Sequence, residues 1–150
     1  MTDTIERIIS FNEKSGLLKK GYDDFLESAF QIEEALEGLE NSDTGLVTTT
    51  VASGTPKQLS RIIVAENLAN AKIPVPDVDR LDKACDAVVY AVGSMAKLGL
   101  NAEQINAAIN VVMDANVVKQ GCKKDKEGKL LKPDNFQGPE PKLLEILNKL

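Results

Sequence analysis

Residues 25–40 read FLESAFQIEEALEGLE. At about 100° per residue, an α-helix places Phe25, Ala29, Ile32, Leu36 and Leu39 on one stripe. The next positions around the helix mix carboxylates with apolar side chains: Glu40, Glu33, Leu26, Glu37 and Phe30. The flank of the core-facing stripe is therefore acidic. Because burying an uncompensated carboxylate costs several kcal/mol, this pattern predicts that cations lie against the flank.

The acidic helix has two interpretations. Glu33 and Glu37 are one turn apart, and Glu34 and Glu37 are three residues apart, so their oxygens can converge on a divalent cation. A solvated acidic helix surface is the simpler alternative. The position of Glu33 and Glu37 beside apolar side chains favours the cation site.

Composition limits the class of protein. A chain of 150 residues suits a single domain, 1–150, with its own core. Apolar residues make up 43% and aromatic residues 4%, so Leu, Ile, Val and Ala build that core, which suits helices. The net charge of −5 argues against a nucleic-acid surface. A phosphorylated small molecule is still compatible, because bound metal ions can carry the positive charge.

The sequence contains no His, which excludes Ser-His-Asp catalysis and His-ligated zinc. Any acid–base or metal chemistry must then use carboxylates, Lys, Tyr or Cys. Cys85 and Cys122 are too few for a disulfide framework. No stretch resembles a signal peptide, and no apolar run reaches the roughly 18 residues of a membrane span. We therefore expect a reduced, cytoplasmic protein with no membrane partner.

Helical periodicity and cap residues divide the chain into helices. Asp3, Thr55 and Asn101 are predicted caps, and Pro56 suits a first helical position. Helices are expected over 4–14, 23–39, 56–71, 78–98 and 102–120, with a short one after Pro141. Residues 41–54 read as a loop in which 47–51 can be extended. The expected fold is all-α, a compact bundle of five or six helices with a four-helix metal-binding core. The tail, 121–150, packs on the bundle or closes over it.

The helix expected over 78–98 carries a second acidic pair. Its apolar arc consists of Leu81, Cys85, Val88, Val89, Val92, Met95 and Ala96. Asp82 and Asp86 lie at the edge of that arc, one turn apart. The helix dipole alone explains an aspartate near the first turn, which suffices for Asp82. Asp86 lies deeper in the helix and is the stronger candidate for a metal ligand.

A polar pair lies near the end of the helix expected over 102–120. Asn116 falls between Ile105 and Ile109 on the apolar stripe, and Lys119 projects beside Val112. A buried Asn that bonds to backbone and a Lys that meets the helix dipole are ordinary alternatives. If both point to the same interior as the acidic groups, Asn116 can fix a sugar or carboxylate and Lys119 can meet a phosphate.

Three stretches occur in a familiar order. They are EEALE at 33–37, DAVVYAVG at 86–93 followed by LGL at 98–100, and NVVK at 116–119 followed by GKLLKP at 128–133. Together they resemble the motifs of the MazG-like and phosphoribosyl-ATP pyrophosphohydrolase-like superfamily of all-α nucleotide pyrophosphohydrolases.

The resemblance implies Mg²⁺-dependent hydrolysis of a nucleoside triphosphate, expected to be a deoxynucleotide, to the monophosphate and pyrophosphate. Mg²⁺, or Mn²⁺ in its place, would be held by Glu34, Glu37, Asp86 and Asp82. Glu33 would orient or deprotonate the attacking water. The substrate would meet Asn116, Lys119, Lys129, Lys132 and, as a contact to the base, Asn12. Members of this superfamily are usually dimers or tetramers, so a homo-oligomer is expected.

Two departures from the family pattern keep alternatives open. Lys83 occupies the position of the Glu in the family's Glu-x-x-Asp motif. Asp82 then replaces that carboxylate, or one metal position is lost, or Lys83 contacts phosphate directly. The helix over 55–71 also lengthens the interval between the two acidic motifs. The rival function is a non-catalytic helical module that binds a nucleotide or metal or regulates an oligomer. A third possible function is that of a structural adaptor, in which the carboxylates are solvated surface groups.

Overall fold

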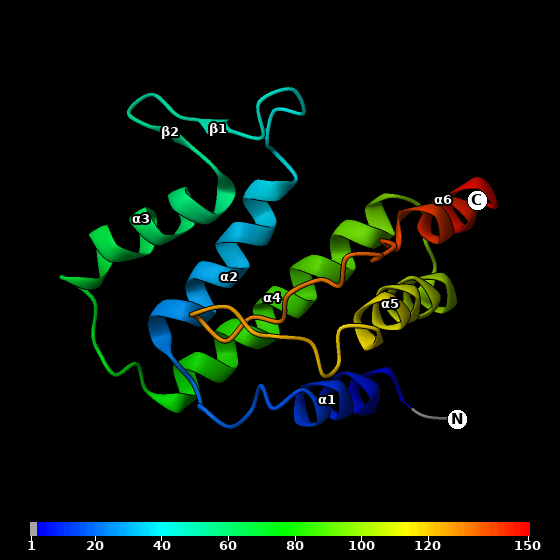
Figure 1. Ribbon diagram of the computed structural model, residues 1–150, viewed down its shortest axis with the longest axis horizontal. Coiled ribbons are helices and arrows are strands. Elements are labelled where there is room, and N and C mark those ends of the chain that lie inside the picture. The colour runs from blue at the N-terminus through cyan, green and yellow to red at the C-terminus, as the bar shows by residue number, and fades with distance from the viewer. Residues whose placement is uncertain (1–2) are drawn as a thin grey trace. The chain divides into compact units, whose positions relative to one another are not determined.

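The computed structural model describes residues 3–150, which fold into six α-helices and two short strands (Figure 1). In chain order the elements are α1 (Thr4–Lys14), α2 (Asp24–Glu37), β1 (Val47–Thr48), β2 (Ser53–Gly54), α3 (Pro56–Leu68), α4 (Asp77–Lys97), α5 (Ala102–Val117) and α6 (Glu140–Asn148). The prediction of a mostly helical protein with five or six helices is confirmed. The four-helix metal-binding core stays a prediction. Among these residues, no helix combines the length and apolarity that a bilayer crossing requires.

Local sequence signals determine where the helices begin. Asp3, Thr55 and Asn101 cap α1, α3 and α5, each in a reciprocal capping box. In the box at α3, Thr55 Oγ1 accepts the Gln58 N–H at 3.2 Å, and Gln58 Oε1 accepts the Thr55 N–H at 3.0 Å. The three predicted caps are therefore confirmed. Both α3 and α5 end earlier than predicted, because turn bonds between residues three apart replace the helical pattern there.

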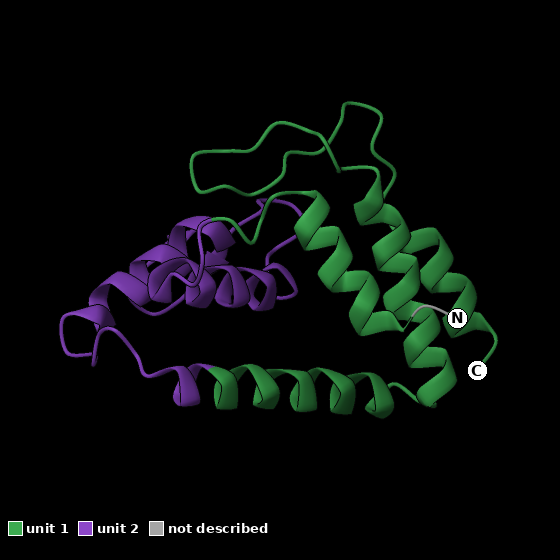
Figure 2. Ribbon diagram, turned by 90° about the horizontal axis from the view of Figure 1, so that it is seen from below, with its two compact units in different colours: residues 1–19, 81–150 green, residues 20–80 purple. Residues whose placement is uncertain are grey.

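The chain divides into two compact units (Figure 2). Unit 2 comprises Lys20–Arg80, and unit 1 comprises the described residues before and after it. Each unit has its own packing. The single domain expected from chain length stays a prediction.

Unit 2 is built on the packing of α2 against α3. Ala29 of α2 and Ser60 of α3 have no exposed surface, and Leu59 and Val64 of α3 are also buried. Small side chains at a contact let two helix axes approach each other closely. The contact between α2 and α3 therefore fixes the buried side of the acidic helix.

A small hairpin connects these two helices. β1 pairs antiparallel with β2, with Val47 opposite Gly54 and Thr48 opposite Ser53. The extended segment expected within 47–51 is thus confined to the residues of β1. Val51, at the turn of the hairpin, is 92% exposed.

Unit 1 has its core on α5. Its buried cluster and the partly buried residues packed on it are Leu100, Ile105, Ala108, Met95, Ile109, Leu143 and Ile146. Because Leu143 and Ile146 belong to α6, this part of the tail packs on α5. On another side, α1 is attached to α5 by Arg7, which donates to Asn110 Oδ1 at 2.9 Å and forms an ion pair with Asp114.

The apolar arc of α4 differs from the expectation of a core-facing surface. No residue of α4 is buried. Leu81, Val88 and Val89 are 67%, 62% and 67% exposed, and Cys85 is exposed as well. An amphipathic pattern predicts a face suited to burial without identifying the element that covers it. At these positions the described part of the chain provides no cover.

Candidate metal centre

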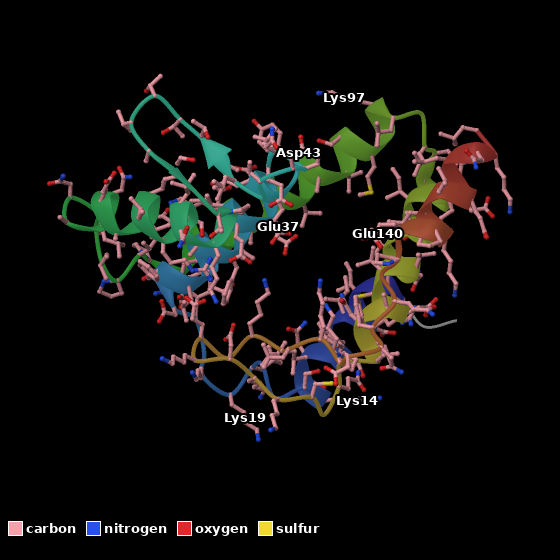
Figure 3. The ribbon with its side chains drawn as sticks, turned by 45° about the horizontal axis from the view of Figure 1, so that its top comes forward. Lys14, Lys19, Glu37, Asp43, Lys97 and Glu140 are labelled. Carbon is pink, nitrogen blue, oxygen red and sulfur yellow. The ribbon has the colours of Figure 1, made fainter. Side chains whose placement is uncertain are left out.

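The C-terminal half of α2 brings three carboxylates together. Glu33, Glu34 and Glu37 each offer an oxygen, and these oxygens lie within 4.8 Å of one another. The helix itself produces this convergence, because residues one turn apart project from the same side. Figure 3 shows Glu37 at the C-terminal end of α2, where the helix stops.

Burial separates the three carboxylates. Glu33 is 4% exposed, as its place on the flank of the apolar stripe predicted. Glu37 lies on the same flank but is exposed, so the expectation that it would be partly buried against the core is wrong. The reason is that Glu37 is the last residue of α2, where solvent reaches the helix end. Glu34 is exposed too.

A cation compensates the buried carboxylate, and it comes from the protein itself. Arg61 of α3 donates from Nη1 to Glu33 Oε1 at 2.5 Å and to Ser60 Oγ at 2.8 Å. The guanidinium also lies 5.4 Å from the centre of the Phe30 ring. The Arg61 and Glu33 side chains are 16% and 6% exposed. The cation predicted on this flank is therefore Arg61, at least for Glu33.

The remaining carboxylates have the chemistry that Mg²⁺ requires. Mg²⁺ prefers oxygen ligands, usually keeps several waters and needs only one or two protein carboxylates. Oxygens bound at about 2.1 Å to one ion lie at most about 4.2 Å apart. Small side-chain rotations would bring the oxygens of Glu34 and Glu37 from within 4.8 Å to this spacing. Both side chains are exposed.

The N-terminal end of α2 is held by a second arginine. Arg80 donates from Nε and Nη2 to the two carboxylate oxygens of Asp24, at 3.1 and 2.8 Å, and stacks 4.5 Å from the Tyr22 ring centre. The hydrogen bond to Asp24 raises the pKa of Arg80. Burial, with a contribution from Asp23, raises the pKa of Glu27. Burial also raises the pKa of Tyr22. This end of the helix is a structural clamp, while the convergent glutamates occupy the other end.

The other predicted metal ligands lie on α4. Asp82, Lys83 and Asp86 belong to unit 1, and all three side chains are exposed. The glutamates of α2 belong to unit 2. The three alternatives therefore stay open: Asp82 replaces the missing carboxylate, one metal position is lost, or Lys83 contacts phosphate directly.

The predicted substrate residues are all in unit 1. Asn116 is half-buried, and Lys119 places Nζ 5.0 Å from the centre of the Phe136 ring. Lys132 places Nζ 5.3 Å from the same centre. The structure therefore brings two of the predicted phosphate contacts to one aromatic side chain.

The other two predicted contacts have local roles. Lys129 is exposed in a turn where its N–H donates to Asp125 Oδ1 at 3.0 Å. Asn12 donates its side-chain amide to the Ile8 carbonyl at 2.8 Å, within α1. A contact from Asn12 to a base would have to break that bond.

Two residues of functional interest, Arg61 and Phe136, were not predicted from the sequence. The basic residues of α3 are Lys57 and Arg61. Once α3 is known to pack on α2, these two are the candidates for a partner of Glu33. Phe136 is one of four Phe in the sequence and follows a lysine-rich stretch. Neither signal identifies the partner before the fold is known.

Comparison of the chain with family models, with curated proteins and with solved structures finds no match. The superfamily resemblance therefore stays a hypothesis.

Proposed function

We propose that this protein hydrolyses a nucleoside or deoxynucleoside triphosphate to the monophosphate and pyrophosphate with Mg²⁺. The observation that carries the proposal is the convergence of Glu33, Glu34 and Glu37 within 4.8 Å on one helix. The motif resemblance supports it. The lack of His is compatible with it, because acid–base or metal chemistry in this chain must use carboxylates, Lys, Tyr or Cys.

In this proposal Glu34 and Glu37 hold the ion. Bound Mg²⁺ supplies neutralisation of the charge that develops on phosphate oxygens. Glu33 orients the attacking water and accepts its proton, while Arg61 fixes the Glu33 carboxylate through Oε1. This division of labour assigns the exposed carboxylates to the ion and the fixed one to the water.

The nucleotide contacts come from the lysine-rich part of unit 1. Lys119 and Lys132 meet phosphate oxygens, Asn116 positions the sugar, and Lys129 covers the phosphates. Lys83 is a phosphate contact in the alternative in which Asp82 does not replace the missing carboxylate. These assignments follow the motif resemblance, and the shared ring of Phe136 supports Lys119 and Lys132.

The second candidate is a non-catalytic module that binds a nucleotide or metal. The bond between Arg61 and Glu33 favours it, because the guanidinium gives the buried carboxylate a structural role. Lys83 in place of a Glu favours it as well. Such a module would bind the ion or nucleotide without turnover.

We expect Mg²⁺ to bind the wild-type chain and to bind Glu34→Gln at least about tenfold more weakly, since even outer-shell groups contribute about 10–100-fold at metal sites. Isothermal titration calorimetry with MgCl₂ measures this. Glu40→Gln is the matched control, because it removes a carboxylate just beyond α2 and outside the cluster. Equal affinity in all three proteins, or no Mg²⁺ binding at all, would favour the adaptor with solvated carboxylates.

We also propose that the protein is a homo-oligomer, a dimer or tetramer, assembled through α4. The arc of Leu81, Val88 and Val89 is exposed, which supports an interface there. α4 begins with acidic side chains and ends with Lys97. Antiparallel pairing of two copies would set each acidic end near a basic end and align the helix dipoles favourably.

Val89→Asp is expected to convert the oligomer to monomer, because it buries an unpaired charge in the interface. Sedimentation velocity at micromolar concentrations measures the change. Val51→Asp is the control, since Val51 is exposed at the turn of the hairpin. A wild-type chain that sediments as a monomer would contradict assembly through α4.

A further inference from the structure

Ser60 of α3 has a polar side chain but no exposed surface. Its Oγ donates to the Lys57 carbonyl at 2.8 Å and accepts a hydrogen bond from Arg61 Nη1, also at 2.8 Å. Arg61 Nη1 in turn donates to Glu33 Oε1 at 2.5 Å. The Ser60 hydroxyl is therefore the middle of a hydrogen-bond chain that runs from the backbone of α3 to the buried carboxylate of α2.

The direction of each bond shows why the chain needs a hydroxyl at this position. Nη1 carries two hydrogens, one for Glu33 and one for Ser60. The hydroxyl hydrogen of Ser60 goes to the Lys57 carbonyl, so the oxygen faces Nη1 as an acceptor. Without this oxygen, a buried N–H of a cation would lose its acceptor, or the guanidinium would turn away from Glu33. Water cannot replace the oxygen, because Ser60 is fully buried.

The Phe30 ring does not perform the same task. It lies three residues before Glu33 on α2, and its centre is 5.4 Å from Arg61 Cζ. Cation–π attraction acts on the guanidinium as a whole, so it does not determine which nitrogen faces the carboxylate. The hydrogen bond to Ser60 does, because it fixes Nη1 at a second point.

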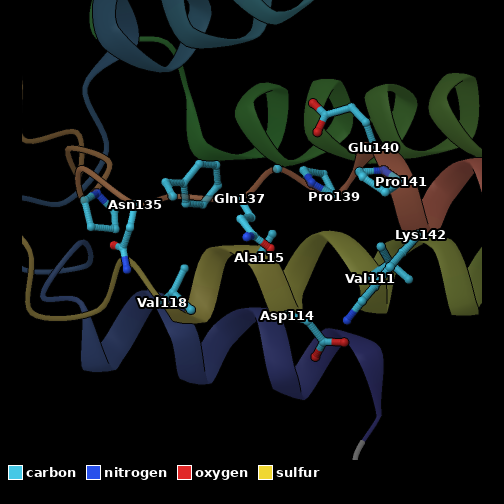
Figure 4. Close-up of a pocket in the computed structure, with 13 residues that line it drawn as sticks. Val111, Asp114, Ala115, Val118, Asn135, Gln137, Pro139, Glu140, Pro141 and Lys142 are labelled. Atoms are coloured by element: carbon cyan, nitrogen blue, oxygen red, sulfur yellow. The ribbon is translucent and has the colours of Figure 1, made fainter.

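The ion pair between Arg7 and Asp114 in unit 1 is the opposite case. Asp114 lies on the wall of a groove between α5 and the segment 133–142 (Figure 4). The Arg7 and Asp114 side chains are 28% and 55% exposed, against 16% and 6% for Arg61 and Glu33. Water reaches the exposed pair and can replace a lost hydrogen bond there. Burial is what makes the Ser60 hydroxyl necessary at the other pair.

We infer that Ser60 is a positioning residue of the proposed reaction, which acts through Arg61 to fix the Glu33 carboxylate that orients the attacking water. This role rests on the proposed function, whereas the hydrogen-bond chain does not. The hydrogen-bond partners of Ser60 are neither proposed Mg²⁺ ligands nor proposed nucleotide contacts. Removing the hydroxyl should therefore slow the reaction without weakening substrate binding.

Ser60→Ala should lower kcat about tenfold or more and leave KM unchanged, as expected for the loss of one hydrogen bond to a charged group. A weaker hold of Arg61 on Glu33 favours the protonated carboxylate, so the acidic limb of the pH–rate profile should move to higher pH. The matched control is Ser94→Ala, since Ser94 Oγ also donates to a helix carbonyl, that of Tyr90 at 3.0 Å, but on an exposed side chain. A Ser60→Ala enzyme with the kcat and pH profile of Ser94→Ala would overturn the inference.

Side-chain ¹⁵N NMR tests the positioning without turnover. Arg7, Arg61 and Arg80 are the arginines of the sequence, so Arg61→Lys assigns the signals of Arg61. A guanidinium held between two fixed acceptors rotates slowly, so we expect separate Nη signals for Arg61 in the wild type and merged signals in Ser60→Ala. Separate signals in a folded Ser60→Ala protein would overturn the inference.

Two further results keep the test decisive. If Ser60→Ala is poorly folded, Ser60→Cys fills the space with a thiol, a weak acceptor, and should also merge the signals. If the wild type shows the expected NMR change on substitution but no turnover, the proposed reaction and the role of Ser60 in it are contradicted, and Ser60 is left to hold Arg61 in a binding module.

Discussion

Replacing Arg61 with Ala is expected to lower the free energy of unfolding by about 3–5 kcal/mol, the cost of leaving one member of a buried ion pair without its partner. Glu33 is 4% exposed and receives the Arg61 guanidinium at 2.5 Å. Without that cation, the carboxylate must either stay buried without its compensating charge or pull α2 away from α3. Urea unfolding followed by circular dichroism measures the loss.

A double-mutant cycle separates the ion pair from general damage to α3. Glu33→Gln combined with Arg61→Ala should be more stable than Arg61→Ala alone, because no uncompensated charge is then buried. Lys72→Ala is the control for loss of one positive charge at an exposed site in the same unit. If Arg61→Ala costs no more than Lys72→Ala, or if the two single changes simply add, the ion pair does not stabilise the packing of α2 on α3.

The ion pair between Glu33 and Arg61 could be predicted only in part from the sequence. The helical wheel predicts the burial of Glu33 and the need for a cation, because both follow from the geometry of one helix. It does not identify Arg61, because that contact joins residues 28 positions apart and depends on how α3 packs. The caps at Asp3, Thr55 and Asn101 were predictable for the opposite reason: each is satisfied within its own first turn.

The difference between features set within one helix and contacts between distant segments also explains where Phe136 and α4 departed from expectation. Lys119 is a candidate from its place on the helix and Lys132 from the motif resemblance, but their shared ring at Phe136 arises from the path of the tail. The apolar arc of α4 was visible in the sequence as a face suited to burial. Its exposure was not, because a periodic pattern contains no information about which element covers it.

The second large effect concerns catalysis. Glu37→Gln keeps the size of the side chain and removes the charge of an exposed ligand candidate at the last residue of α2. We expect it to lower Mg²⁺-dependent turnover by more than about 100-fold, the upper end of what outer-shell groups contribute to metal sites. Glu40→Gln, which lies outside the cluster, should keep the wild-type rate.

The most direct measurement is pyrophosphate release from a panel of dNTPs and NTPs, with and without Mg²⁺, by wild type, Glu37→Gln and Glu40→Gln. The proposed function predicts release that requires Mg²⁺, that Glu37→Gln abolishes and that Glu40→Gln preserves, and the panel would identify the preferred base. No release from any substrate by the folded wild-type protein would contradict the enzyme and favour the binding module, and Lys83→Glu would be the first variant to test.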